Sequence, residues 1–191
     1  RLPILESKDI EQLIRWEGRE HLDAALAGGR GVILVSMHLG GYEFAGAYLS
    51  AIGYHVTAVT EDIAPSMYEI LRQYRSATGT RLLSRRDGLS AYRVLQRGEV
   101  LAVVADRLIG GPGVAVDFGG AVRMMPIGPA ALAARAGAPI IVGYVVRDPE
   151  GGAQYRGVTE AARVALGRVE DMTDTMARDF VRIVRQYPDQ W

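Results

Sequence analysis

One short segment, from His38 to Glu43, holds residue types suited to proton transfer. The histidine follows an apolar run that predicts a buried strand, and the glutamate falls in the first turn of the helix expected next. Gly40 and Gly41 permit a tight return of the chain between them. We therefore expect the Glu43 carboxylate to reach one imidazole nitrogen and fix the tautomer, leaving the other nitrogen to accept a proton from a substrate hydroxyl.

The same two residues also have a purely structural interpretation. His38 could simply close a strand, and Glu43 could stabilise a helix N-terminus, where acidic side chains are favoured. His21 and His55 have no comparable acidic partner; His21 is expected to precede a helix, and His55 to start a strand. We predict no metal site, because three histidines without a zincin-type pair would need carboxylates converging from distant segments.

The elements that must position these residues alternate between strands and helices. Apolar runs predict buried strands at 32–35, 101–105 and 140–146, with further strands at 55–60, 80–84 and, as shorter edge strands, within 155–166. Helices are expected at 42–52, 65–78, 88–97, 128–136 and 172–186, and a hairpin at 114–118 and 122–125. This order predicts an α/β fold with a mostly parallel mixed sheet flanked by helices on both faces. Chemistry gathers at the carboxyl ends of such strands, where His38 and Asp106 both fall.

Composition narrows the class of protein. A chain of 191 residues is long enough for one domain with a well-formed core, so we expect a single domain over 1–191. Its 22 basic and 22 acidic residues balance, which gives no global electrostatic case for nucleic-acid binding. The absence of cysteine excludes disulfides and thiolate nucleophiles. No apolar run approaches the roughly 20 residues that a membrane-spanning helix needs.

A series of segments, in order along the chain, resembles a known family. It begins with Trp16-Glu17-Gly18 and 31–34, passes through the segment from His38 to Glu43, and is densest at 105–107, 117–120, 125–130 and 137–141, before ending at 187–191. These segments are similar to the bacterial lipid A biosynthesis (lauroyl/myristoyl) acyltransferases and the related phosphatidylinositol mannoside acyltransferases, within the lysophospholipid acyltransferase-like superfamily. The resemblance implies a glycerol-3-phosphate acyltransferase-like fold.

The resemblance also implies an activity, namely transfer of a fatty acyl group from acyl-CoA or acyl carrier protein to a hydroxyl of a membrane glycolipid or phospholipid. No cofactor is needed beyond that co-substrate. The family's histidine corresponds to His38 and its acidic partner to Glu43. The implied location is peripheral, on the cytoplasmic face of the bacterial inner membrane. The family's N-terminal membrane-associating part is missing or very short here, and an anchor before Arg1 could have been removed.

Two departures leave the acceptor lipid open. Gly41-Tyr42 stands where lipid A enzymes commonly have asparagine and tryptophan. Asp106-Arg107 looks more like the mannoside enzymes than the aspartate-glutamine often seen in the lipid A enzymes.

Further residues are expected to bind the acyl donor. Five arginines lie close together and could receive phosphates or form a solvated helix face: Arg72, Arg75, Arg81, Arg85 and Arg86. The resemblance favours Arg75 among them and suggests that Glu61 lines the site. Asp106 and Arg107, after a buried strand, could face the pocket, pair with each other's neighbours or hold the His38 loop. Gly128 is expected to begin a helix whose backbone N–H groups stabilise an oxyanion or hold a phosphate, although helix capping alone also explains it.

Two other functions remain open at this stage. With water as the acceptor, the same histidine and acid would make an acyl-thioester hydrolase. A non-catalytic module that binds acyl lipids is the alternative from a different class. Release of free thiol from acyl-CoA, with and without added lipid, distinguishes the three.

Overall fold

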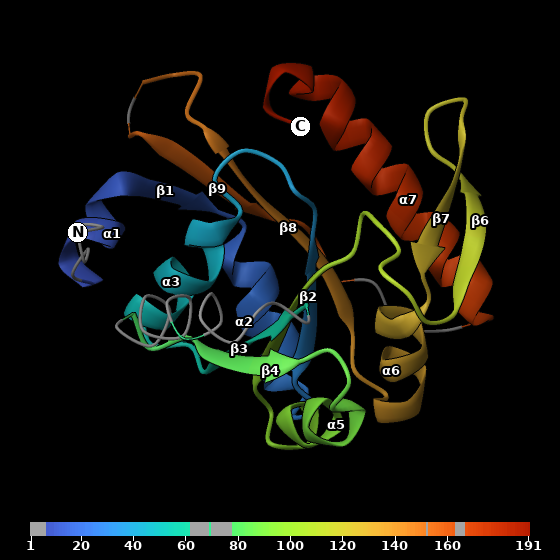
Figure 1. Ribbon diagram of the computed structural model, residues 1–191. Coiled ribbons are helices and arrows are strands. Elements are labelled where there is room, and N and C mark those ends of the chain that lie inside the picture. Colours follow the sequence, from blue (N-terminus) through green and yellow to red (C-terminus); the bar gives the residue numbers. More distant parts are fainter. Residues whose placement is uncertain (1–6, 62–68, 70–77, 152, 163–166) are drawn as a thin grey trace.

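The computed structural model of the chain describes residues 7–61, 69, 78–151, 153–162 and 167–191. Within these residues, seven strands form one sheet in the order β1–β9–β8–β2–β5–β3–β4 (Figure 1). These strands are β1 (Ile14–Glu17), β2 (Val32–Ser36), β3 (Val56–Thr60), β4 (Arg81–Ser84), β5 (Val100–Val104), β8 (Ile140–Arg147) and β9 (Tyr155–Thr159). The helices are α1 (Ser7–Leu13), α2 (Arg19–Ala27), α3 (Glu43–Ala51), α5 (Gly88–Gln96), α6 (Gly128–Ala136), α7 (Val169–Gln186) and the short 3-10 helix η1 (Pro188–Gln190).

The predicted fold class is confirmed. β2 lies at the centre of the sheet, with every residue buried, and pairs in parallel with β5 on one side and β8 on the other. β3 is parallel to both β5 and β4, whereas β8 and β9 are antiparallel. The sheet is therefore mixed but mostly parallel, as the alternation of elements predicts. The helix expected from Pro65 to about Thr78 lies almost entirely outside the described residues.

Alternate residues of the central strands bury their side chains against different helices. Ile33 and Val35 of β2 belong to a core that includes side chains of α5, α6 and α7. Val32 and Leu34 belong to a second core with Leu22 of α2 and other side chains that include residues of α3. A strand that is apolar on both faces must be packed against other elements on both, and the two cores provide this packing. Figure 1 shows α2 and α3 apart from the pair α6 and α7.

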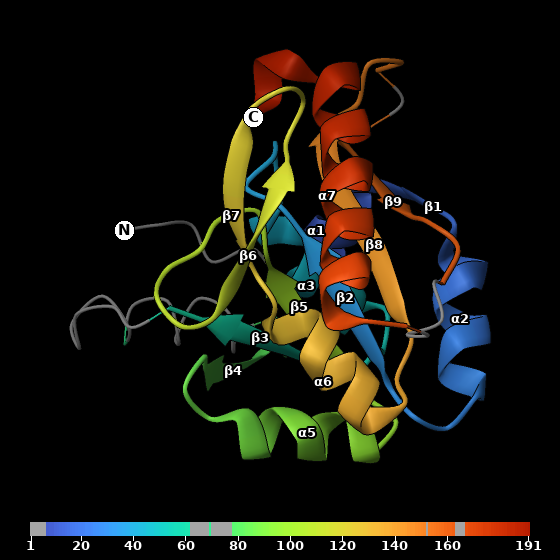
Figure 2. The same ribbon diagram turned by 90° about the vertical axis from the view of Figure 1, so that its right-hand side faces the viewer.

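The predicted hairpin is also confirmed. Strands β6 (Gly113–Asp117) and β7 (Val122–Pro126) pair antiparallel and lie beside α7 (Figure 2). Gly119 and Gly120 both have positive φ, 73° and 100°, which the tight connection requires. The Asp117 carboxylate accepts a hydrogen bond from the backbone N–H of Gly120 at 2.7 Å and closes the turn.

The predictions for the end of the sheet formed by β9 and β1 were partly wrong. The strand expected as an edge, β9, lies between β8 and β1. The edge is β1, which pairs in parallel with β9 from Ile14 to Glu17 and which the sequence did not predict. This strand is short and contains Arg15 and Glu17, so its apolar pattern is weak. His21, expected before a helix, lies inside α2. No helix of the described residues is both long and apolar enough to cross a bilayer.

Candidate active site

A gap opens between β3 and β5 at the carboxyl ends of the strands. Their register stops at the pair Ala58 and Ala102, whereas β2 and β5 continue in register to Ser36 and Val104. The chain after β3 leads to β4 on one side, and the chain after β5 leads to β8 on the other. Neighbouring strands whose connections leave in opposite directions form the crevice in which open α/β sheets bind ligands.

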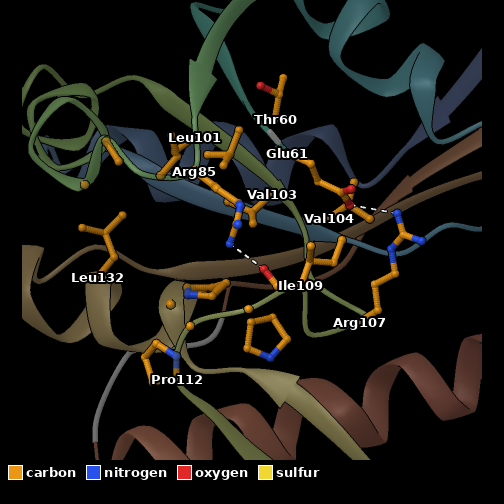
Figure 3. Close-up of a pocket in the computed structure, with 18 residues that line it drawn as sticks. Thr60, Glu61, Arg85, Leu101, Val103, Val104, Arg107, Ile109, Pro112 and Leu132 are labelled. Carbon is orange, nitrogen blue, oxygen red and sulfur yellow. Dashed lines mark hydrogen bonds and ion pairs between the residues drawn. The ribbon is translucent and has the colours of Figure 1, made fainter. Parts of the chain in front are cut away.

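A largely apolar cavity of about 340 Å³ lies against this gap (Figure 3). This volume is at the lower end of the range typical of small-molecule sites, roughly 300–1,000 Å³. One wall is formed by the ends of β3 and β5, and the others come from α5, α6 and the loop after β5. The lining side chains that matter below are Glu61, Arg85, Ala91, Leu101, Val103, Arg107, Gly128 and Leu132.

Three charged side chains line this cavity, Glu61, Arg85 and Arg107. An Arg107 guanidinium nitrogen lies 2.8 Å from a Glu61 carboxylate oxygen, so an ion pair joins the segment after β3 to the segment after β5. Arg85 donates a hydrogen bond to the carbonyl oxygen of Ile109 on the opposite wall. In Figure 3 both contacts are drawn, and Leu132 lies far from the Glu61–Arg107 pair across the cavity. The cavity thus combines an apolar interior with cationic groups able to receive an anion.

His38 follows β2, which pairs with β5 on the side away from β3, and its ring is held by Asp106. Nδ1 of His38 is 2.7 Å from Oδ1 of Asp106, and the backbone N–H of His38 donates to Oδ2 of the same carboxylate at 3.2 Å. The Asp106 side chain is 6% exposed and that of His38 is 31% exposed. Both residues follow paired parallel strands, because Ser36 and Val104 are in register. With Nδ1 engaged by a carboxylate, Nε2 is the nitrogen left to exchange a proton with a substrate.

The loop after His38 is held by backbone hydrogen bonds to β8 and to η1. The backbone N–H of Gly40 donates to the carbonyl of Gln190 at 2.8 Å, and that of Gly41 donates to the carbonyl of Val145 at 2.9 Å. Gly40 has a φ of 53°, and a Cβ added there would lie 2.5 Å from the Val145 carbonyl oxygen. Glycine is therefore required both for the backbone conformation and for the close approach of β8.

We predict that Gly40→Ala lowers the free energy of unfolding by about 2–4 kcal/mol, from the left-handed conformation and the steric clash together. Gly29 is a matched control, because it has a φ of 71° and no atom within 4 Å of an added Cβ. Gly29→Ala should cost about 1–2 kcal/mol, the conformational part alone. Urea denaturation of both variants measures the difference, and equal losses would contradict the proposed clash with β8.

The sequence-predicted acid, Glu43, is the first residue of α3. It lines a second, smaller cavity of about 70 Å³ between α3 and the sheet, together with Ser36 and Tyr42. The Tyr42 ring contacts the His38 ring edge-on, with centroids 5.1 Å apart. The predicted bond from Glu43 to the imidazole remains a prediction, and the contact with Asp106 occupies Nδ1.

The structure brings most of the predicted donor-binding residues to the same cavity. Glu61, Arg107 and Gly128 all line it, and Gly128 begins α6 as expected. Asp106 is not among the lining residues; it contacts the backbone and the ring of His38, as in the alternative that it holds the His38 loop. Arg75 lies outside the described residues. Among the other arginines of that group, Arg85 lines the cavity, whereas Arg81 forms an ion pair with Glu99.

Comparison with known proteins identifies the family. The bacterial lipid A biosynthesis acyltransferase family matches residues 1–191. The chain belongs to this family. In this chain His38, the gap between β3 and β5 and part of the cavity wall all lie at the carboxyl ends of the parallel strands.

Curated relatives of this acyltransferase-family chain come from mycobacteria. Phosphatidylinositol mannoside acyltransferases of Mycobacterium tuberculosis, strains CDC 1551 / Oshkosh and ATCC 25618 / H37Rv, are each 32% identical over 200 residues, covering 100% of this chain and 62% of their own length. The protein of that name from Mycolicibacterium smegmatis is 28% identical over 197 residues, covering 100% of this chain and 64% of its own. The chain thus spans less than two thirds of the length of these relatives.

Proposed function

We propose that this chain transfers a fatty acyl group from an acyl thioester to a hydroxyl of a membrane glycolipid, with His38 as the general base. The observation that carries the proposal is the imidazole whose Nδ1 lies 2.7 Å from the buried carboxylate of Asp106, the residue before Arg107, which lines a largely apolar cavity. Membership of an acyltransferase family supports the reaction class. The names of the mycobacterial relatives favour a mannosylated phosphatidylinositol as the acceptor.

In the proposed reaction the acceptor hydroxyl loses its proton to Nε2 of His38 as its oxygen attacks the thioester carbonyl carbon. The new C–O bond gives a tetrahedral intermediate, which collapses with cleavage of the C–S bond. The departing thiolate takes the proton from the imidazolium, so the products are an ester and a free thiol. The nearby carboxylate stabilises the transient imidazolium.

We place the acyl donor in the cavity between β5, α5 and α6. Its apolar part, lined by Leu101, Val103 and Leu132, suits a hydrocarbon chain. The guanidinium of Arg107 suits a phosphate of coenzyme A or of a carrier protein's prosthetic arm. The start of α6 at Gly128 adds backbone N–H groups that favour an anion. Such a protein would work peripherally at the cytoplasmic face of the inner membrane, where thioester donors and lipid acceptors meet.

The test is an assay of purified protein with acyl-CoA or acylated carrier protein, with and without phosphatidylinositol mannosides. Free thiol is followed together with mass spectrometry of the lipids. Thiol release that depends on added lipid, with formation of an acylated lipid, supports the proposal and identifies the donor. Equal thiol release without lipid would indicate a hydrolase, and a bound acyl chain without turnover would indicate a binding module.

Arg107→Gln should raise the KM for the acyl donor about 10-fold, because one charge-assisted hydrogen bond to a phosphate is lost. The free energy of unfolding should change by less than about 1 kcal/mol, since the pair with Glu61 is exposed. Arg178→Gln is the matched control, because it removes an exposed arginine paired with Asp174 on α7, outside the cavity. An unchanged KM for the acyl donor in Arg107→Gln would show that Arg107 does not bind the donor.

A further inference from the structure

We propose that one exposed surface of the β6–β7 hairpin binds to a bilayer that contains anionic phospholipid. This hairpin surface is made of Val122, Arg123, Met124 and Trp191. The acceptor lipid that the bilayer would present rests on the proposed function, whereas binding to the bilayer does not. Three observations carry the inference: exposed apolar side chains, cations beside them, and a contact that joins this surface to the loop after His38.

Two large apolar side chains of β7 face solvent. Val122 is 80% exposed and Met124 is 47% exposed, and their spacing of two residues places them on one face of the strand. The other face of the hairpin is held firmly, because Val116 and Met125 are buried in the core that includes side chains of α7. Exposed apolar side chains that lie side by side are typical of surfaces that bind a membrane or another molecule.

An arginine and a tryptophan stand next to these apolar side chains. The Trp191 ring stacks on Phe118 with centroids 5.5 Å apart, and the Arg123 guanidinium lies 5.2 Å from the Trp191 centroid and 5.3 Å from that of Phe118. Trp191 is itself 47% exposed. Tryptophan and arginine combine an apolar body with a polar end, and such side chains are favoured at the level of the lipid headgroups.

The charge around the hairpin turn suits an anionic lipid. Arg185 of α7 lies beside the turn, since a Cβ added at Gly119 would be 3.9 Å from a guanidinium nitrogen of Arg185. The acids nearby are already engaged: Asp117 accepts a backbone N–H within the turn, and Asp189 forms an ion pair. The guanidinium of Arg123, which lies over two rings, and that of Arg185 are therefore available to lipid phosphates.

The hairpin surface lies at the end of the molecule that holds the His38 loop. In Figures 1 and 2 the turn between β6 and β7, the C-terminus and the loop after β2 all lie in the upper part of the view, and α5 lies at the bottom. The carbonyl of Gln190, the residue before Trp191, accepts the backbone N–H of Gly40 at 2.8 Å. A bilayer on this surface would face the end of the sheet at which a lipid hydroxyl must reach the imidazole.

The size of the surface favours a bilayer over a protein partner. A stable protein interface buries about 800 Å² on each side and involves roughly 20–30 residues of each partner. Three exposed apolar side chains fall far short of that. Shallow insertion between lipid headgroups needs only a few apolar side chains together with cations, because the two contributions add.

The first test is co-sedimentation with lipid vesicles. The protein should bind vesicles of phosphatidylcholine mixed equally with phosphatidylinositol, and bind phosphatidylcholine alone more weakly. The double variant Val122→Thr/Met124→Gln should bind the mixed vesicles about 10-fold less tightly, because two apolar side chains no longer favour insertion. Arg123→Gln should reduce binding about 5-fold.

A matched control removes an exposed apolar side chain elsewhere. Leu89 on α5 is 57% exposed and lies outside the hairpin surface, so Leu89→Gln should bind vesicles as the unaltered protein does. Threonine keeps the β-branched shape of valine, and glutamine is about as long as methionine. The midpoint of thermal unfolding of the double variant should therefore stay close to that of the unaltered protein, which separates lost binding from lost folding.

The second test places a fluorescent ring at the same position. Val122→Trp should bind the mixed vesicles at least as tightly as the unaltered protein does, and brominated phosphatidylcholine should quench its added fluorescence. Leu89→Trp, on α5, should show no added quenching. Equal quenching of the two variants, or none in Val122→Trp, would contradict insertion of the hairpin.

The remaining outcomes are distinguishable. Equal binding to vesicles with and without phosphatidylinositol would overturn the preference for anionic lipid, and no binding to either would overturn the whole proposal. A dimer in analytical ultracentrifugation that the double variant loses, without vesicle binding, would assign the surface to a second copy of this chain instead. If vesicles bind through the hairpin but no acyl group is transferred, the proposed function fails while the bilayer-binding surface stands.

Discussion

Replacing His38 with glutamine should reduce acyl transfer by about 10²–10⁴-fold, the range expected for loss of a general base. Glutamine has no group that accepts a proton at neutral pH, but its amide can still donate to the buried Asp106 carboxylate. The variant should therefore fold, and its midpoint of thermal unfolding should stay close to that of the unaltered protein. The rate is measured as acylated lipid formed at saturating donor.

His55→Gln is the matched control for this prediction. His55 is exposed and lies just before β3, at the opposite end of that strand from the gap. It should retain full activity, since its ring takes no part in the proposed reaction. Activity above half of normal in a folded His38→Gln variant would end the proposal that this imidazole is the base.

Filling the cavity should change which acyl chains the protein accepts. Ala91 is 7% exposed, lies on α5 and lines the cavity. Ala91→Leu would place three additional carbon atoms in the space proposed for the hydrocarbon chain. If these displace about three methylenes of a long acyl group, the loss is about 2.4 kcal/mol, or roughly 50-fold in kcat/KM. Shorter acyl donors should be affected much less, which makes the ratio of long-chain to short-chain kcat/KM the measurement.

A control on the same helix separates cavity filling from general disturbance of α5. Leu89 is 57% exposed, so Leu89→Phe adds carbon atoms on the solvent side. This variant should leave the chain-length ratio unchanged. If Ala91→Leu lowers kcat/KM equally for all chain lengths, the acyl chain does not occupy this cavity.

The local periodicity of the sequence predicted most of the elements. The run at 32–35 has no polar interruption, and it became the fully buried central strand β2. Helix α6 occupies the residues predicted for it, because proline near its start and Gly137 after its end are strong boundary signals. The short strand β1 was missed, since its apolar pattern is interrupted by charge and its burial depends on pairing with β9.

The candidate site was predicted less completely than the fold. The segment around His38 and the resemblance it carries identified the imidazole, and the ends of the strands identified Asp106 as a neighbour of the site. One predicted alternative had Asp106 holding the His38 loop, but its bond to the imidazole was not predicted, because the two residues are 68 positions apart. Spacing along the chain favours a partner five positions away, such as Glu43, over one brought close by strand pairing.

What the sequence determines by itself is local: which runs are strands, which are helices, and that His38 and Asp106 each follow a buried strand. The tertiary structure decides that β5 pairs with β2 and that Val104 is in register with Ser36. The physical reason is that strand order and register depend on how distant apolar surfaces pack against each other, which no local pattern encodes. That register brings the carboxylate of Asp106 within hydrogen-bonding distance of Nδ1 of His38.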